Sequence, residues 1–574
     1  MSSGATRRSV PYIALTISLV TPALADRVAQ TTSVSVDEAQ QCGALNALHL
    51  EHLAGGPAVV TSARLIDVPA SGLEWPVYPT LSGFASPVTR SFRELHRYCD
   101  VTGYVAPQNK FELKLPLPAD WNQKLFFEAC GGFCGTLDGR LCNLGLARGS
   151  ASVTSNGGHD SASGFDGAWA ANAPELQDDF GWRSTHVVTL AAKAIVAQYY
   201  GRPIAHAYLA GNSKGGQAVL MEAQRFPNDF DGLLPSAPVY DYTGRNMMAA
   251  AWFAQAISDG QGGSVLDEAA ARTIHRSVLA RCGAQAGVEE GLVTDPPSCD
   301  WRPDMIACAA GAHAADCLTA RQVFAVTRLM TPVRNSAGEM LWPYPYLPGS
   351  ETQWAGWNYF GAPSSGVVPR LANVLLPEQF GTYLVDATVR PRVDAFLFDF
   401  DRIPATLARS RRIYDATSVD LRAFKQHGGK IVMWHGWADG AMPATSSIGY
   451  YRSVEQFMGG RAQTEDFFRL FLLPGVHHGG GGPGLTDFDA LSALEQWVEA
   501  GEAPTKLIAS RSANGIVERS RPIFPYPVLA HYRGTGDPTH ADSFVPFDPE
   551  PVRAHTPKEI AQPFRHLGRG RSRE

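Results

Sequence analysis

The chain has 574 residues, a formal net charge of −6 and a pI of about 6.3. This length is sufficient for one large hydrophobic core or for two domains. The slightly acidic balance and the lack of a basic patch argue against nucleic acid as a partner, because binding to phosphates needs clustered lysine and arginine. Neither composition nor charge indicates an oligomeric state.

The first 25 residues have the pattern of a secretory signal peptide. Arg7-Arg8 precedes an apolar run over residues 10–20, and Ala23-Leu24-Ala25 precedes the expected cleavage before Asp26. A membrane anchor is the alternative, but this run is shorter than the ~20 residues that cross a bilayer. No other segment is long and apolar enough to do so. We therefore expect export to the periplasm or the medium, and no membrane partner.

Short apolar runs alternate with helical stretches over residues 40–240, and the pattern resumes at residue 431. This alternation predicts a doubly wound, mostly parallel sheet. The expected strands lie at residues 124–129, 151–154, 205–210 and 467–473, with a further strand that begins at residue 430. The expected helices lie at residues 185–200, 216–225 and 488–500.

The composition changes between residues 242 and 426, where four cysteines, a proline-rich stretch at 342–348 and many aromatic residues occur. We interpret this segment as a lid domain inserted into an α/β core that residues 26–241 and 427–560 form; residues 561–574, rich in arginine, are expected to be a disordered tail. The aromatic side chains could line a pocket for an aromatic acid, or they could form the lid's own core. For any single residue the second interpretation is the more common, so none is assigned to binding: Trp354, Trp357, Tyr359, Phe360, Phe396, Phe398 and Phe400.

The segment Gly211-Asn212-Ser213-Lys214-Gly215 joins an expected strand to an expected helix. A Gly-x-Ser-x-Gly turn between a strand and a helix is typical of the nucleophile elbow of α/β-hydrolases. The turn is so sharp that a Cβ at Gly211 or Gly215 would clash, and it holds Ser213 exposed at the strand tip. The motif alone is usually a turn of small residues, but the flanking strand and helix favour a nucleophilic serine.

A nucleophilic serine needs a base and an acid, which in this fold follow it in the order Asp or Glu and then His. Asp439 lies in the loop after the strand that begins at residue 430, and His477 lies in the loop after the strand at 467–473. In isolation, Asp439 would be interpreted as a loop-capping residue and His477 as a surface histidine. Their order, and their position at the sheet edge where ligands bind in open α/β folds, favour a triad with Ser213.

An oxyanion hole needs two preorganised N–H donors. We expect the backbone amide of Lys214, directly after the nucleophile, and that of Gly131, in the loop after the strand at 124–129. Glycines in that loop allow the backbone to approach a substrate closely. A tight turn without a catalytic part is the alternative.

Several longer segments, which together span roughly the whole mature chain, resemble one known family. They are residues 169–186, 222–232 after the serine, 435–439 with Tyr450-Tyr451, Pro525-Tyr526-Pro527 and 532–537. The family is that of tannases and feruloyl esterases, whose members include mono(2-hydroxyethyl) terephthalate hydrolases. The resemblance implies an α/β-hydrolase fold with Ser213 as nucleophile, His477 as base and Asp439 as the residue that orients the base.

Nine cysteines in an exported chain suggest disulfides. The resemblance implies the pairs Cys42–Cys99, Cys282–Cys299 and Cys308–Cys317. Three cysteines remain, so that one of them is unpaired or bonded outside the chain: Cys130, Cys134 and Cys142. A metal site on these three is a weak alternative, because zinc spacing usually comes with a second ligand pair.

The family usually has a disulfide beneath its triad, between cysteines directly before the serine and directly after the histidine. Asn212 and His478 stand at these positions here. We expect their side chains to lie close together and to share a hydrogen bond or a water, because asparagine offers both a donor and an acceptor.

Many members of the family also bind calcium in the lid, through aspartates that follow a cysteine. At the matching positions after Cys282, Gly283 and Ala286 replace carboxylates and only Glu290 keeps one. Calcium takes about six to eight oxygen ligands, several of them charged. We therefore expect no tightly bound calcium, no other metal and no cofactor.

These features predict a secreted serine carboxylic ester hydrolase that acts on a small-molecule ester. The resemblance implies an aromatic acyl group, such as a hydroxycinnamate, a gallate or a terephthalate monoester. An esterase for aliphatic or polyester-derived substrates is one alternative. A secreted binding protein that has kept the fold and lost turnover is another, which the complete triad disfavours.

Overall fold

The computed structural model describes residues 38–77, 88–92, 96–261, 263–309, 316–359, 371–385, 393–513 and 516–549. The predicted signal peptide, the predicted C-terminal tail and Phe360 lie outside these ranges.

Ten strands form one central sheet, in the order β1-β2-β5-β6-β8-β7-β9-β10-β13-β14. The six strands from β8 to β14 in this order are parallel, whereas the pairs that involve β1, β2, β5 and β6 are antiparallel. Their bounds are β1 His49–Leu50, β2 Ala58–Asp67, β5 Arg97–Val105, β6 Asn109–Pro116, β7 Lys124–Ala129, β8 Ala151–Ser155, β9 His206–Asn212, β10 Gly232–Ser236, β13 Lys430–Gly436 and β14 Phe468–Leu473.

The predicted α/β-hydrolase fold is confirmed, and every strand expected from the sequence is present within two residues at either end. The N-terminal strands β1, β2, β5 and β6 differ from the expected βα alternation, because they pair antiparallel. Residues 106–108 alone join β5 to β6, and a parallel pair needs a crossover of about a dozen residues or more. The short connection therefore makes this pair antiparallel.

Helices cover both faces of the parallel half of the sheet. On β9, Ala207 and Leu209 belong to the larger hydrophobic cluster, which includes side chains of α4 (Ser184–Tyr200) and α5 (Lys214–Arg225). The alternate residues Tyr208 and Ala210 belong to a second cluster with side chains of α14 (Ala490–Ala500). Both faces of β9 are buried, which is why its sequence is a continuous apolar run rather than an alternating one.

The predicted helices at residues 185–200, 216–225 and 488–500 correspond to α4, α5 and α14, with differences of one or two residues at their N-terminal ends. Two of them end at a glycine in the left-handed region, Gly201 with φ 68° and Gly501 with φ 74°. Glycine adopts this conformation without a Cβ penalty. Helix α14 begins after Asp489, whose side chain accepts a hydrogen bond from the Ser492 amide.

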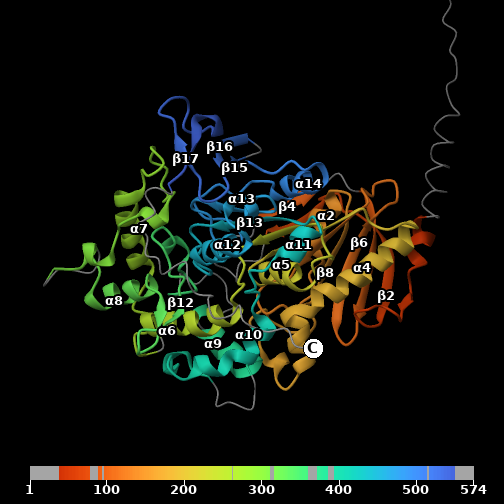
Figure 1. Cartoon of the computed structure of the whole chain (residues 1–574), viewed down its shortest axis with the longest axis horizontal. Helices are drawn as coiled ribbons and strands as arrows, with labels where there is room; N and C mark the ends of the chain where they lie inside the picture. Colours follow the sequence, from red (N-terminus) through yellow and green to blue (C-terminus); the bar gives the residue numbers. More distant parts are fainter. Residues whose placement is uncertain are drawn as a thin grey trace, which may run out of the picture.

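The segment predicted to be a lid, residues 242–426, lies between β10 and β13, and none of its described strands joins the central sheet. We keep the name lid for this segment. Figure 1 shows most of its helices, in green and teal, grouped on the side of the molecule away from β2 and β6. Its main elements are α6 Ala250–Ile257, α7 Glu268–Cys282, α8 Ala320–Leu329, β11 Val333–Arg334, β12 Met340–Trp342, α9 Ala372–Gln379, α10 Ala408–Tyr414 and α11 Arg422–Gln426.

The remaining elements surround the sheet, and the C-terminal hairpins among them lack a clear signal in the sequence. They are β3 Leu73–Val77, β4 Val88–Phe92, α2 Asn143–Ala147, α3 Pro174–Asp178, α12 Thr445–Met458, α13 Arg461–Glu465, β15 Leu507–Ala513, β16 Ile516–Ile523, β17 Leu529–Tyr532 and β18 Phe544–Phe547. The hairpins contact the lid, since the Tyr532 amide in β17 donates a hydrogen bond to the Ala286 carbonyl at 2.8 Å.

Four disulfides are present among the described residues, and they include the pairs Cys42–Cys99, Cys282–Cys299 and Cys308–Cys317 that the resemblance implies. The fourth joins Cys130 to Cys134. Cys142 is the cysteine left free, and it is buried. Burial raises the pKa of its thiol well above the usual value.

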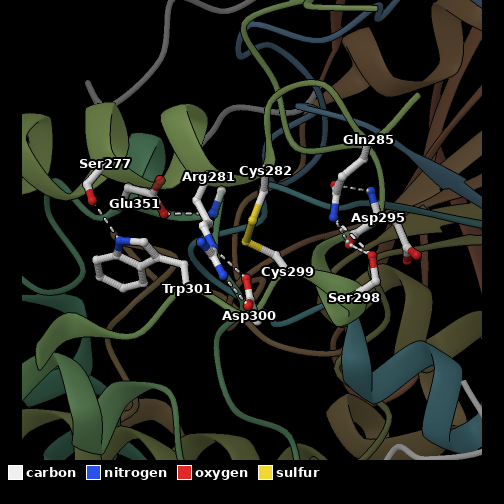
Figure 2. Close-up of a disulfide and its surroundings, with 11 residues drawn as sticks. Ser277, Arg281, Cys282, Gln285, Asp295, Ser298, Cys299, Asp300, Trp301 and Glu351 are labelled. Atoms are coloured by element: carbon white, nitrogen blue, oxygen red, sulfur yellow. Dashed lines mark hydrogen bonds and ion pairs between the residues drawn. A yellow bond between two sulfur atoms is a disulfide. The ribbon is translucent and has the colours of Figure 1, made fainter. Parts of the chain in front are cut away.

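The lid segment after Cys282 is held by an amide side chain, which Figure 2 shows beside the disulfide to Cys299. Gln285 Nε2 donates to the Asp295 carbonyl and to Ser298 Oγ, both at 2.9 Å, and Gln285 Oε1 accepts from the Asp295 amide at 3.0 Å. These three bonds join the two halves of the loop that the disulfide closes.

The residues in this segment do not fit the calcium ion that the resemblance implies for other family members. Gly283 and Ala286 have no side-chain oxygen. The remaining carboxylate, Glu290, forms an ion pair with the buried Arg521 guanidinium and lies 3.9 Å from Arg519. An arginine therefore neutralises the charge that a calcium ion would need.

We accordingly expect calcium removal to have no effect on stability. A bound ion stabilises the folded state by mass action, so a chain without the site keeps its melting temperature when EDTA replaces calcium in the buffer. Differential scanning fluorimetry measures this, with elemental analysis after exhaustive dialysis. Near-stoichiometric calcium, or a melting temperature that falls in EDTA, would contradict it.

The free thiol gives a second expectation. Titration with Ellman's reagent should detect no thiol in the native protein, because Cys142 is buried, and one thiol per chain after denaturation without reductant. Three thiols after denaturation would show that Cys130 and Cys134 are not bonded to each other.

Candidate active site

Ser213 occupies a strained turn between β9 and α5. Its φ of 60° lies in the left-handed region, and its ψ is −116°. A Cβ on Gly211 would lie 2.5 Å from the carbonyl carbon of Gly215, and a Cβ on Gly215 would lie 2.8 Å from the Ala129 oxygen. The predicted requirement for both glycines is confirmed. A backbone held in this conformation by its surroundings is common at functional sites.

Asp439 lies in the loop after β13 and is almost completely buried. Oδ1 accepts hydrogen bonds from the amides of Ala441 at 2.8 Å and Met442 at 2.7 Å. Oδ2 accepts from His478 Nδ1 at 2.7 Å and from His435 Nε2 at 3.0 Å. Burial by itself would raise the pKa of this carboxyl, but the two histidines hold that pKa well below its usual range. The Asp439 side chain is therefore ionised.

Of the two histidines that follow β14, His478 contacts Asp439, and the prediction that His477 does so is wrong by one position. His478 lines the same cavity as Ser213. His477 Nε2 instead lies 2.9 Å from Thr352 Oγ1 of the lid. Two consecutive histidines follow β14, and which of them faces Asp439 depends on the backbone of the loop. The order Ser, Asp, His along the chain therefore does not distinguish His477 from His478.

Asp439 has a second imidazole partner, His435, whose role was not predicted from the sequence. Its Nε2 lies 3.0 Å from Asp439 Oδ2 and 2.8 Å from the Met442 carbonyl, and its Nδ1 lies 2.8 Å from Ser447 Oγ. Both neighbours of Nε2 are acceptors, so Nε2 carries a proton. His435 thus donates to Asp439 Oδ2, the same carboxylate oxygen that His478 contacts.

A cavity of about 570 Å³ lies over Ser213, within the range typical of small-molecule sites. Core and lid residues both line it, and the lining contains several aromatic rings. Of the described aromatic residues singled out in the lid sequence, Trp357 lines the cavity and Trp354 is fully buried elsewhere. The lining includes Gly131, Phe133, Phe165, Ser213, Tyr242, Arg245, Trp357, Leu376 and His478.

The two expected oxyanion donors lie at this cavity. Gly131 and Lys214 both line it. A Cβ on Gly131 would meet no atom within 4 Å, and the Cys130–Cys134 disulfide closes the loop that contains it. Lys214 is the first residue of α5, where an amide has no acceptor within the helix. Their role in binding an oxyanion stays a prediction.

The direct hydrogen bond expected between Asn212 and His478 is not formed, although both residues line the cavity. Asn212 Oδ1 accepts from Ser236 Oγ at 3.0 Å, and His478 Nδ1 is bonded to Asp439. With His478 next to Asp439, the position directly after that histidine is Gly479. The family's bridging cysteines are therefore replaced by Asn212 and Gly479, and no side chain at residue 479 can reach the elbow.

One group of potential metal ligands occurs among the described residues, away from the cavity. Atoms of His186, Glu222 and Asp229 lie within 4.8 Å of one another. His186 Nδ1 lies 2.6 Å from Asp229 Oδ2, and burial raises the pKa of Glu222 well above its usual value. The raised pKa favours the protonated form of Glu222, which is a poorer metal ligand than the carboxylate. Within the described ranges, no helix is long and apolar enough to cross a membrane.

Comparison with known proteins identifies the family of the chain. Residues 90–546 match the family model described as tannase and feruloyl esterase. The chain is 32% identical to mono(2-hydroxyethyl) terephthalate hydrolase of Piscinibacter sakaiensis, over 79% of this chain and 85% of the relative. It is 30% identical to a probable feruloyl esterase of Arthroderma benhamiae, over 75% of this chain and 81% of the relative.

The fold is also similar to that of feruloyl esterase B from Aspergillus oryzae, with a TM-score of 0.74 and 22% identity. That superposition covers 89% of this chain and all of the solved one. From the match to the family model over most of its length, and from its identity to these relatives, the chain belongs to the tannase and feruloyl esterase family.

Proposed function

We propose that the protein is an exported serine carboxylic ester hydrolase for esters of aromatic acids. The observation that carries the proposal is that Ser213 and His478 line one cavity, while the buried Asp439 is hydrogen-bonded to His478 from behind. Family membership supports it, since relatives are named as feruloyl esterases and as a terephthalate monoester hydrolase.

In this proposal Ser213 Oγ attacks the ester carbonyl, and His478 Nε2 takes the serine proton. Asp439 holds His478 through Nδ1 and stabilises the imidazolium ion that forms. The amides of Lys214 and Gly131 receive the developing oxyanion. His478 then returns the proton to the leaving alcohol, and water hydrolyses the acyl-enzyme by the same route.

An aromatic acyl group is consistent with the cavity. Phe133, Tyr242 and Trp357 line it, and aromatic rings favour offset or edge-on contacts with another ring. A panel of methyl ferulate, methyl gallate, mono(2-hydroxyethyl) terephthalate and methyl butyrate tests the assignment, because all four have unactivated alcohols as leaving groups. At least one aromatic acid ester should have a kcat/KM about tenfold or more above the aliphatic one, because an aromatic ring buries more apolar surface.

Export is supported by the disulfides. Four disulfides in one chain are typical of proteins that fold in an oxidising compartment. The signal peptide predicted for the first 25 residues would direct the chain there.

The assignment of the base is tested by two neighbouring substitutions. His478→Ala and Ser213→Ala should each lower kcat by roughly 10³-fold to 10⁶-fold, because triad members act as a unit. His477→Ala should lower kcat less than about tenfold, since His477 contacts Thr352 rather than Asp439. Hydrolysis of the best ester of the panel measures all three. A dispensable His478 together with an essential His477 would reverse the assignment.

His477 has a separate effect, on stability at acid pH. Burial lowers the pKa of its imidazole to about 4, with the charge of His275 also lowering it and that of Asp439 raising it. The unfolded chain binds a proton near pH 6.5 and the folded chain does not, so stability is full above pH 6.5 and falls as the pH drops toward 4. At pH 5 the loss from this group is about 2 kcal/mol.

We therefore expect the free energy of unfolding to decrease more between pH 7 and pH 5 in the wild type than in His477→Gln, which does not titrate. Urea unfolding at both pH values measures the two differences. Equal decreases would show that His477 does not stay neutral in the folded protein.

A further inference from the structure

One side-chain oxygen of the lid lies between the loops that contain Asp439 and His478. Gln353 Oε1 accepts a hydrogen bond from the Gly440 amide at 2.9 Å and another from the His478 amide at 2.9 Å. Gly440 directly follows Asp439 in the chain. A single atom of the lid therefore joins the backbone of the acid loop to that of the base loop, immediately beside the Asp439–His478 hydrogen bond.

Gln353 is well placed to fix these loops. It is only 4% exposed and ends the 3-10 turn Glu351–Gln353. The turn is anchored on both sides. Thr352 Oγ1 lies 2.9 Å from His477 Nε2, and Glu351 Oε1 lies 2.8 Å from His275 Nδ1 on α7.

Gly440 fits tightly against the same residue. A Cβ on Gly440 would lie 2.4 Å from the Gln353 carbonyl oxygen. The Gly440 carbonyl accepts from Tyr346 of the lid at 2.7 Å. The amide and the carbonyl of Gly440 are thus both bonded to lid side chains, so the acid loop has little freedom to move away from Gln353.

We propose that Gln353 is a positioning residue for the triad, which keeps His478 in register with Asp439 through the two backbone amides. The proposal rests on the proposed function. It also accounts for Asn212 and Gly479 at the positions where family members have bridging cysteines, because here a hydrogen-bonding side chain of the lid, rather than a disulfide to the elbow, fixes the base loop.

The predicted effect is on kcat rather than KM. Gln353 does not line the described cavity, so its loss does not remove a contact to the substrate. A displacement of His478 by about 1 Å lowers the rate of the chemical step by about 100-fold. A residue that only stabilised the fold would instead lower the melting temperature and leave kcat unchanged.

The experiment compares four variants with p-nitrophenyl acetate as the probe. Gln353→Met keeps the size and removes the acceptor, Gln353→Asn shortens the side chain, and Gln353→Glu keeps the acceptor oxygens. Gln285→Met is the matched control, because Gln285 also joins two halves of a lid loop by its amide (Figure 2) and has no contact with the triad.

Gln353→Met and Gln353→Asn should lower kcat about 10-fold to 100-fold and change KM less than about twofold. Gln353→Glu should restore kcat to within about fivefold of the wild type. When the pH is lowered, its kcat/KM should begin to fall at a higher pH than that of the wild type, because a carboxylate beside His478 favours the imidazolium form. Gln285→Met should lower the melting temperature and leave kcat unchanged.

A wild-type kcat in Gln353→Met, or in Gln353→Asn if the methionine variant does not fold, would overturn the inference. So would equal losses of kcat in Gln353→Met and Gln285→Met. Ser213→Ala, measured in parallel, separates this outcome from a failure of the proposed function: an active Ser213→Ala contradicts the function itself, whereas an inactive one leaves only the role of Gln353 in question.

Discussion

The structure of the site depends on one buried anion, the carboxylate of Asp439. An ionised carboxylate out of contact with water is costly unless hydrogen bonds replace the lost hydration. Here two backbone amides and two imidazoles supply four such bonds. The amides come from the loop that contains Asp439, so the charge fixes the loop's own conformation. The imidazoles come from β13 and from the loop after β14, so the same charge brings two strands' ends together and sets the orientation of His478.

Residues of the lid contribute to this arrangement as well as lining the cavity. Gln353 accepts from the acid and base loops, and Arg245 donates to the Ala441 carbonyl through Nε at 2.9 Å and through a second nitrogen at 2.6 Å. The Ala441 amide in turn donates to Asp439. Changes in the lid are therefore expected to alter the rate of the chemical step as well as the choice of substrate, because the lid and the triad share these hydrogen bonds.

The sequence predicts those parts of the fold that local chemistry determines. The buried parallel strands appear as apolar runs. The elbow is identified by Gly211 and Gly215, because a Cβ at either position would clash with the neighbouring backbone. The sequence does not predict which of His477 and His478 faces Asp439, because the direction of each side chain depends on a glycine-rich loop after β14. The role of Gln353 cannot be predicted from the sequence either. Gln353 lies 87 residues before Gly440 and 125 residues before His478, and only the folded lid brings them together.

In the proposed mechanism, Asp439 acts through His478 to activate Ser213. Labelling with a fluorophosphonate followed by peptide mapping tests it without knowledge of the substrate, because the reagent reacts only with an activated serine. We expect one adduct, on Ser213, in the wild type and in His477→Gln, and none in His478→Gln over the same time. Labelling of His478→Gln at the wild-type rate, or an adduct on another residue, would contradict it.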